Sequence, residues 1–98
     1  MIHRPPHIYL DREWYFITAH TIGRTPLFIS NEQKSIWINE FNLLTKKIKV
    51  DIAAWVLLEN HYHLLCYFDK STQIPNFLKT LHGVTSYQLN KFNQKQGR

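Results

Sequence analysis

Residues 51–68 read DIAAWVLLENHYHLLCYF, two apolar runs that meet at Glu59–Asn60. Each run has the length of a β-strand, and asparagine is one of the residues that tolerate a tight turn. The stretch therefore predicts a β-hairpin. Side chains alternate between the two faces of a strand, so His61 and His63 share one face of the second strand while Tyr62 faces the other way.

Three further elements flank the hairpin. The segment EWYFITAHT (Glu13–Thr21) is rich in aromatic and β-branched side chains, which predicts a strand. Ser30 and Gln33 have the spacing of a capping box, and apolar residues then recur every three or four positions. This pattern predicts an amphipathic helix from Asn31 to about Lys47. A second stripe with helical spacing follows the hairpin, at Ile74, Phe77, Leu78, Leu81, Val84, Leu89 and Phe92.

The order of these elements is strand, helix, strand, strand, helix, which predicts an α+β fold. It matches the first five elements of a ferredoxin-like (RRM-like) βαββαβ unit with an antiparallel sheet. The last strand of that unit is expected to be missing. A length of 98 residues suits one domain, so residues 1–98 are expected to form a single domain with an extended lead-in at residues 1–11, where two prolines are adjacent.

Composition narrows the class of protein. Cys66 is the one cysteine, which excludes an intrachain disulfide and zinc sites built on paired cysteines. No stretch approaches the roughly 18 apolar residues of a membrane span, and the first residues lack the apolar segment of a signal peptide. We therefore expect a soluble, cytoplasmic protein that does not act in a membrane. The net charge of +5 attracts polyanions, although many small basic domains bind no nucleic acid.

His61 and His63 are the first candidates for chemistry. Their Cβ atoms are expected to lie roughly 6–7 Å apart, a separation from which both rings can converge on one cation. Two ligands on a rigid strand, with the other positions open, fit a catalytic metal site better than a structural one. The same pair next to a turn is equally typical of a solvated or hydrogen-bonded strand end. The spacing alone leaves both interpretations open.

Three stretches, in order along the chain, resemble one known family. They are YFITAHTIGRTPLF (Tyr15–Phe28), AWVLLENHYHLLCYF (Ala54–Phe68) and IPNFLKTLHGVTSYQLNKFNQKQGR (Ile74–Arg98). Together they resemble the single-tyrosine transposases of the HUH superfamily, which include the REP-associated tyrosine transposases and the IS200-like transposases. The resemblance covers nearly the whole chain.

Within these stretches, Asn60, His61 and His63 match the family's central motif, with Glu59 where a proline is usual, and Leu89–Lys91 match the end of its helix. The resemblance implies a single-strand DNA endonuclease and strand transferase. The two histidines would hold Mg²⁺ or Mn²⁺, while a tyrosine hydroxyl attacks the scissile phosphate. The choice of metal follows from the family alone, because imidazoles suit zinc, nickel or copper at least as well.

The resemblance also implies partners. They are single-stranded or hairpin DNA and a second copy of the chain, because family members commonly form homodimers through their sheets. A third metal ligand is implied as well, on the helix that carries the catalytic tyrosine. No residue of this sequence matches that ligand.

The nucleophile has no assured position in this sequence. The resemblance implies that the tyrosine helix follows Arg98, so the chain is expected to lack it. Tyr62 faces away from the histidines, and Tyr67 lies two strand steps beyond His63. Tyr87 on the last helix is the one internal substitute, and its position is equally typical of a residue that packs at the helix boundary.

Other candidate residues have structural explanations beside the functional ones. Trp14, Trp37 and Trp55 offer stacking surfaces for bases, although tryptophans more often fill a core. His20 is a candidate for the same sheet face as the metal, but a partly buried, hydrogen-bonded histidine is the commoner case. Cys66 is expected to be a buried apolar side chain. The residues proposed to follow a phosphate backbone are Arg24, Lys79, Lys91, Lys95 and Arg98.

Two other functions fit parts of the pattern. A non-catalytic module that binds single-stranded nucleic acid, or an inactive transposase remnant, would have the same element order and a similar charge. A phosphoesterase with paired His-x-Thr or His-x-Ser motifs fits less well, because one His-x-His motif occurs and no second motif matches it. Metal-dependent cleavage of single-stranded DNA would separate the enzyme from the binding module.

Overall fold

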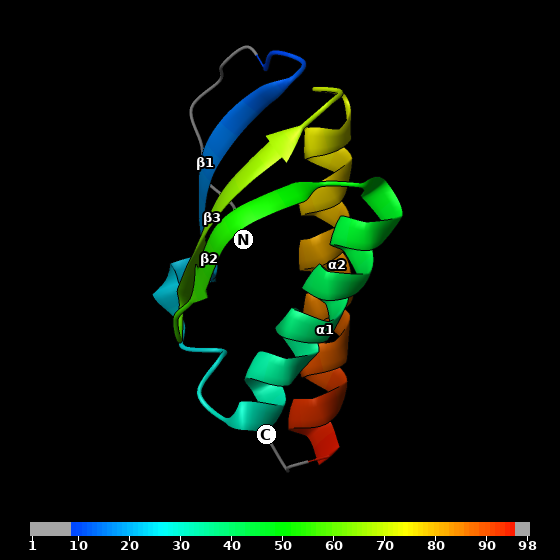
Figure 1. The fold of residues 1–98 in the computed structure, drawn as a ribbon. Helices are drawn as coiled ribbons and strands as arrows, with labels where there is room; N and C mark the ends of the chain where they lie inside the picture. Colours follow the sequence, from blue (N-terminus) through cyan, green and yellow to red (C-terminus); the bar gives the residue numbers. More distant parts are fainter. Residues whose placement is uncertain (1–8, 96–98) are drawn as a thin grey trace.

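The computed structural model describes residues 9–95. Its elements are β1 (Glu13–His20), the short 3-10 helix η1 (Ile22–Arg24), α1 (Asn31–Ile48), β2 (Asp51–Leu57), β3 (His61–Phe68) and α2 (Gln73–Lys95). The strands form an antiparallel sheet in the order β1-β3-β2, and both helices cover the same face of it (Figure 1). The predicted α+β fold is confirmed. Between residues 9 and 95 there is no fourth strand.

Short-range signals fix both ends of α1. The Ser30 hydroxyl accepts a hydrogen bond from the backbone N–H of Gln33 at 3.1 Å, and the Gln33 side-chain oxygen accepts one from the N–H of Ser30 at 3.0 Å. This is the capping box that the sequence predicts. At the other end, Lys49 adopts the left-handed conformation with φ 62°, which stops the helix one residue beyond the predicted Lys47.

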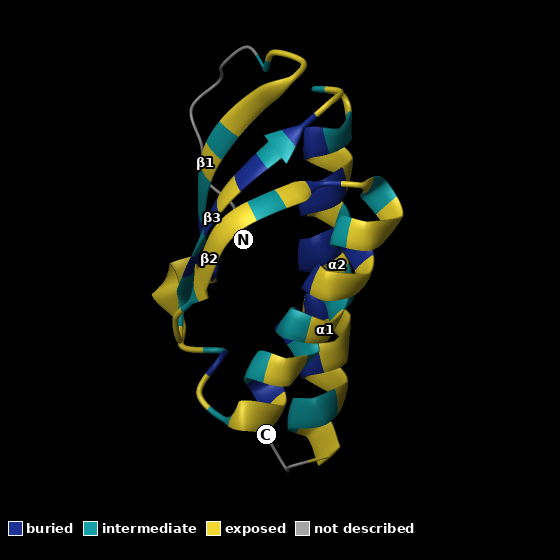
Figure 2. Ribbon diagram, in the orientation of Figure 1, coloured by how far each residue is buried: buried dark blue, intermediate teal, exposed yellow. Residues whose placement is uncertain are grey.

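The core fills the space between the sheet and the helices (Figure 2). It takes alternate residues of β3 and the apolar stripes of both helices, as the sequence pattern predicts. The prediction that the tryptophans fill the core holds for Trp37 alone. Trp14 is 49% exposed because it lies on the face of the sheet away from the helices, and Trp55 is 43% exposed because β2 is an edge strand. The buried residues of β3 are Tyr62, Leu64, Cys66 and Phe68.

Among residues 9–95, no helix covers the second face of the sheet (Figure 1). We call it the open face. Residues that are paired across an antiparallel sheet share a face, so the register defines its members. They are Trp14, Phe16, Thr18 and His20 of β1, His61, His63, Leu65 and Tyr67 of β3, and Asp51, Ala54 and Val56 of β2.

The ends of the chain are described in part. Most of the lead-in predicted for residues 1–11 lies outside the described residues. From residue 9 to residue 95, the helices are too short or too polar to cross a membrane.

Candidate functional site

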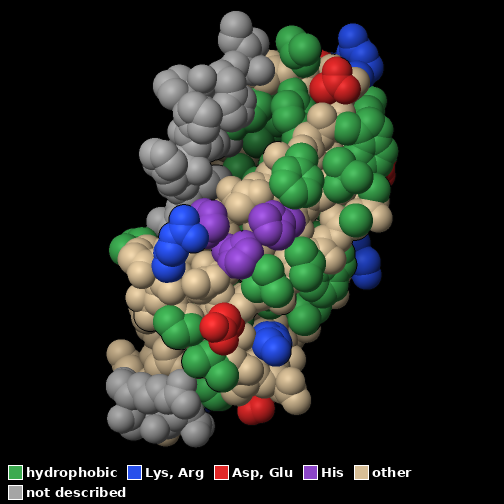
Figure 3. Space-filling model, turned by 90° about the vertical axis from the view of Figure 1, so that its left-hand side faces the viewer, with side chains coloured by type: hydrophobic (Ala, Val, Ile, Leu, Met, Phe, Trp, Pro, Cys, Tyr) green, Lys and Arg blue, Asp and Glu red, His purple; other side chains and the backbone are tan. Residues whose placement is uncertain are grey.

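His61 and His63 lie side by side on the open face. Both belong to β3, the central strand, and their ring centres are 5.0 Å apart with the ring planes at 82°. Histidine side chains gather near the middle of this face (Figure 3). The placement predicted from strand alternation is confirmed. Metal binding by the pair stays a prediction.

Asn60 orients the first of these rings. Its amide nitrogen donates a hydrogen bond to the carbonyl oxygen of Arg24 at 3.2 Å, so its amide oxygen faces His61. That oxygen lies 2.8 Å from Nδ1 of His61. Since an amide oxygen only accepts, Nδ1 must be the donor, and the lone pair of the neutral ring is then on Nε2. A neighbour that fixes the tautomer in this way is typical of histidines that bind metals.

Two residues of β1 hold the second ring. The hydroxyl of Thr18 lies 2.8 Å from Nδ1 of His63, which leaves Nε2 of His63 unengaged by this bond. The ring of Phe16 stacks on the same imidazole, with ring centres 5.5 Å apart and planes at 18°. Thr18 lies directly opposite His63 in the sheet, so the register produces this contact. Both imidazoles therefore have their Nδ1 atom occupied by a neighbour.

His20 is the third histidine of the open face. It lies directly opposite His61, and the two rings stack with their centres 5.2 Å apart. The predicted sheet face is thus confirmed, but the expected hydrogen bond is not found, because Nδ1 of His20 is buried without a partner in the described chain. Burial lowers the pKa of His20, and the positive charge of Arg24 and the neighbouring imidazoles lower it further.

The donor set fits a divalent ion in part. Two imidazoles whose Nδ1 atoms are engaged can offer two Nε2 atoms on one side of a rigid strand. Across residues 9–95, however, no three side chains of His, Cys, Asp or Glu are already arranged to hold a metal ion. The geometry supplies two oriented ligands and leaves the remaining positions to water, substrate or further side chains.

The described tyrosines lie away from the two histidines. Tyr62 is fully buried among the core residues and its hydroxyl bonds to His82, while burial raises its pKa. The hydroxyl of Tyr15 donates to the carbonyl oxygen of Leu10 at 2.7 Å. Tyr67 is on the open face but four residues beyond His63, which is roughly 13 Å along a strand.

Tyr87 is 61% exposed on α2, and the amine of Lys91 lies 5.5 Å from its ring centre. The helix α2 packs on the face of the sheet opposite to the open face. The sheet therefore separates Tyr87 from His61 and His63. The role of Tyr87 as a nucleophile stays a prediction that this placement does not favour.

The predicted DNA-binding cations do not all lie near the histidines: one follows a strand of the sheet and three lie on helix α2. Arg24 follows β1 and lies close enough to His20 to lower the pKa of that ring. In Figure 3 a basic side chain adjoins the histidines. By contrast, Lys79, Lys91 and Lys95 are exposed on α2, and Arg98 lies outside the described residues. The structure therefore brings one of the five beside the histidines.

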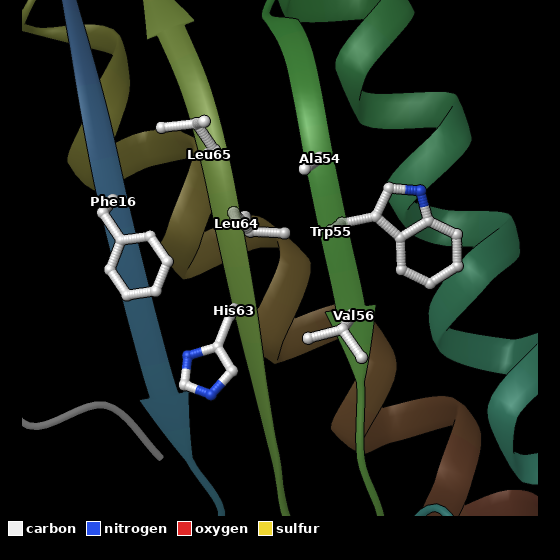
Figure 4. A pocket seen from close by; sticks show the side chains of 7 residues that line it. All are labelled: Phe16, Ala54, Trp55, Val56, His63, Leu64 and Leu65. Atoms are coloured by element: carbon white, nitrogen blue, oxygen red, sulfur yellow. The ribbon is translucent and has the colours of Figure 1, made fainter.

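An apolar hollow adjoins His63. It has a volume of about 270 Å³, and Phe16, Leu65 and Val56 form its walls together with His63 (Figure 4). Phe16 is 70% exposed, which is unusual for a side chain of this size. The open face thus combines a polar part, with the histidines, and an apolar part.

Sequence reasoning missed three contributors to this site and its support. It treated Asn60 as a turn residue and a motif match, and it assigned nothing to Thr18 or to His82. The strand pattern places Thr18 on the face of Phe16 and His20, but its contact with His63 depends on a pairing between residues 45 positions apart. Nothing in the local pattern reveals that pairing.

Comparison with known proteins identifies the family. The family model described as "Transposase IS200 like" matches residues 13–98. The chain therefore belongs to the IS200-like transposase family, as the sequence resemblance implies. Transposases of this family are generally dependent on a metal ion. No curated protein matches the chain.

Two solved structures share its fold. A structure from Deinococcus radiodurans R1, provisionally assigned as a transposase, is 14% identical with a TM-score of 0.69, over 98% of this chain and 73% of that chain. A REP-associated tyrosine transposase bound to a REP hairpin is 14% identical with a TM-score of 0.73, over 91% of this chain and 54% of that chain. This chain thus spans about half the length of the second protein. At such low identity, the likeness shows the fold alone.

Proposed function

We propose that the chain acts on single-stranded, hairpin-forming DNA as the metal-binding part of a transposase that nicks and joins strands. One observation carries the proposal. In a chain of the IS200-like family, His61 and His63 lie 5.0 Å apart on the helix-free face of the sheet, each with its Nδ1 atom engaged. The REP-hairpin complex of the structural neighbour supports hairpin DNA as the substrate class.

Each residue of the site has a proposed part. A divalent ion, Mg²⁺ or Mn²⁺, would supply Lewis-acid stabilisation of the scissile phosphate when bound. His61 and His63 would hold that ion through Nε2. Asn60 and Thr18 would keep the two rings turned toward it. Arg24 would place a positive charge where a phosphate approaches the open face.

The attacking hydroxyl is proposed to come from a tyrosine outside residues 9–95. A nucleophile must come within roughly 3–3.5 Å of the phosphorus, and Tyr87, Tyr62 and Tyr67 are separated from the histidines by the sheet, by burial and by distance along the strand, respectively. In that step the tyrosine oxygen bonds to phosphorus as the bond to the leaving sugar oxygen breaks, and the hydroxyl proton passes to the leaving oxygen through water. A homodimer joined through the sheets is proposed as the assembly.

A second candidate is a non-catalytic module that binds single-stranded nucleic acid. The exposed ring of Phe16 favours it, because bases stack on exposed aromatic side chains of RRM-like sheets. In this alternative the hairpin DNA binds without metal and is never cut. We propose a cytoplasmic location for either function, since both act on DNA or RNA and use no membrane.

The deciding experiment incubates the chain with Mn²⁺ and a labelled hairpin DNA, measures binding on a native gel and separates covalent and cleaved products on a denaturing gel. We expect metal-enhanced binding with little covalent phosphotyrosine product from residues 1–98 alone. The variant His61→Ala/His63→Ala should bind the hairpin without any enhancement by Mn²⁺. If Mn²⁺ still enhances hairpin binding in this double variant, His61 and His63 do not hold the ion. The non-catalytic binding module is then the better assignment.

The variant Tyr87→Phe tests the nucleophile in the same assay. A covalent adduct that forms with the parent chain and disappears in this variant would place the nucleophile at Tyr87 and overturn our assignment. Tyr67→Phe is the matched control, because Tyr67 shares the open face with the histidines.

A further inference from the structure

We propose that His20 is a third imidazole ligand of the metal site on the open face, and that the three-histidine set favours a zinc-type ion such as Zn²⁺ or Co²⁺ over the Mg²⁺ or Mn²⁺ named above. The inference rests on the function proposed above, because it adds a ligand to the same site. It concerns a residue outside the Asn60–His63 motif, contributed by a different strand.

The backbone already groups the three histidines. His20 pairs directly with His61, and His63 follows two residues later on the same strand. Side chains directly opposite each other in an antiparallel pair have Cβ atoms roughly 5 Å apart, and diagonal neighbours are roughly 7–8 Å apart. The three Cβ atoms therefore form a compact triangle on one face, as wide as imidazole side chains can span.

The ring separations are those of imidazoles that share an ion. Two imidazoles bound to one tetrahedral ion have ring centres about 5 Å apart, because each metal–nitrogen bond is about 2 Å long. The ring centres of His20 and His61 are 5.2 Å apart, and those of His61 and His63 are 5.0 Å apart. Neither pair has to separate or approach to accommodate a metal ion.

One rotation completes the set. The rings of His20 and His61 are stacked, with planes at 28°, whereas two imidazoles that share an ion point toward a common position. A turn of the His20 ring about its side-chain bonds would bring one nitrogen to the shared point. Within the described residues, Nδ1 of His20 is buried without a hydrogen-bond partner, so the turn breaks no hydrogen bond at this atom. A ligand bond would satisfy a polar group that is otherwise costly to bury.

The ligand type sets the preference among ions. Imidazole nitrogen suits zinc and related transition ions, whereas Mg²⁺ prefers carboxylate, carbonyl and water oxygens. Three histidines with an open fourth position form a recognised catalytic zinc set. The fourth position on the open face would accept a phosphate oxygen of the DNA.

The test titrates the full chain with Co²⁺ and follows both the affinity and the visible absorption of the bound ion. The parent chain should show the intense bands of four-coordinate Co²⁺ and should bind Co²⁺ and Zn²⁺ more tightly than Mn²⁺ or Mg²⁺. His20→Phe keeps a planar ring opposite His61 but removes the nitrogens. We expect it to weaken Co²⁺ binding by about tenfold or more and to change the spectrum. His20→Asp supplies an oxygen ligand and should move the preference toward Mn²⁺.

Controls separate the possible failures. Trp14→Phe, a change at an exposed ring of the same strand that has no metal-ligating atom, should leave Co²⁺ binding unchanged, and circular dichroism checks that each variant is folded. If His20→Phe binds Co²⁺ with the parent's affinity and spectrum while His61→Ala/His63→Ala does not, His20 is not a ligand and the two-histidine site remains. If the double alanine variant also binds Co²⁺ like the parent, the metal site proposed above fails too.

Discussion

Asn60 contributes to the site through its side chain as well as through the turn. Its amide bridges the carbonyl oxygen of Arg24 and the Nδ1 atom of His61. Asn60→Ala removes the acceptor that fixes the His61 tautomer, and changes of this kind typically lower metal affinity about 10–100-fold. Calorimetric titration with Mn²⁺ measures the loss. Asn39→Ala, at an exposed asparagine of α1, is the matched control and should leave the affinity unchanged. Equal losses in both variants would show that Asn60 does not orient the ring.

Cys66 lies on the buried side of the same strand. Burial raises the pKa of its thiol to about 12, so the thiol stays protonated at neutral pH. We expect a thiol reagent at pH 8 to react slowly with the native chain and fully in urea. A raised thiol pKa stabilises the fold below the unfolded value of 9.0, and this contribution is lost as the pH rises from there toward 12. Fast labelling of the native protein would show that the strand opens readily.

At the scale of single residues, alternation along β3 was enough to predict that His61 and His63 share a face and that Tyr62 and Cys66 face the core. It could not predict which atoms the rings contact. The contact of His63 with Thr18 needs the register between β1 and β3, which the core as a whole determines.

The first turn of α1 depends on its capping box. Ser30→Ala removes the hydroxyl that accepts the Gln33 N–H, and loss of such a cap costs about 1 kcal/mol of stability. Urea unfolding should show a lower midpoint with an unchanged slope. Ser35→Ala makes the same chemical change at an exposed position inside the helix, where it should be neutral or slightly stabilising. If Ser30→Ala leaves the urea midpoint unchanged, the stability of α1 comes from its packing alone.

A buried hydrogen bond joins β3 to α2. The hydroxyl of Tyr62, which lies between the two site histidines in sequence, bonds to Nε2 of His82. Tyr62→Phe removes the hydroxyl from a buried position, and we expect a loss of about 1–2 kcal/mol in the free energy of unfolding. Tyr87→Phe is the same change at a residue that is 61% exposed, and it should cost less than about 0.5 kcal/mol. Similar losses in the two variants would contradict a structural role for the Tyr62–His82 bond.

The elements themselves could be predicted nearly to their ends. The strand expected at Glu13–Thr21 is β1 (Glu13–His20), and the helix expected to start at Asn31 does so because its cap is encoded locally. The position of β3 between β1 and β2 followed only from the resemblance to a ferredoxin-like unit. The short helix η1 was not expected, because no periodic pattern of apolar residues marks positions 22–24.

The whole molecule carries a net charge of +5, but one of the predicted DNA-binding cations lies beside the histidines. We expect the affinity for hairpin DNA to fall steeply with salt, as phosphate contacts release counterions. Arg24→Ala should weaken binding and reduce the salt slope by about one unit. Lys91→Ala, on the helical layer, should have the smaller effect. Fluorescence anisotropy at several salt concentrations compares the DNA affinities of the two variants. A larger loss for Lys91→Ala than for Arg24→Ala would place the DNA on the helices.

Because β3 is bordered by a strand on each side and backed by both helices, its amide groups should exchange with solvent deuterium only when the whole domain unfolds. Within the described residues, by contrast, the outer strands β1 and β2 each have an edge that no other strand pairs, from which they can fray. The two histidines of the proposed metal pair are therefore carried by the slowest-opening segment of the sheet. Partial openings that expose β1 or β2 to proteases would leave His61 and His63 in place relative to each other.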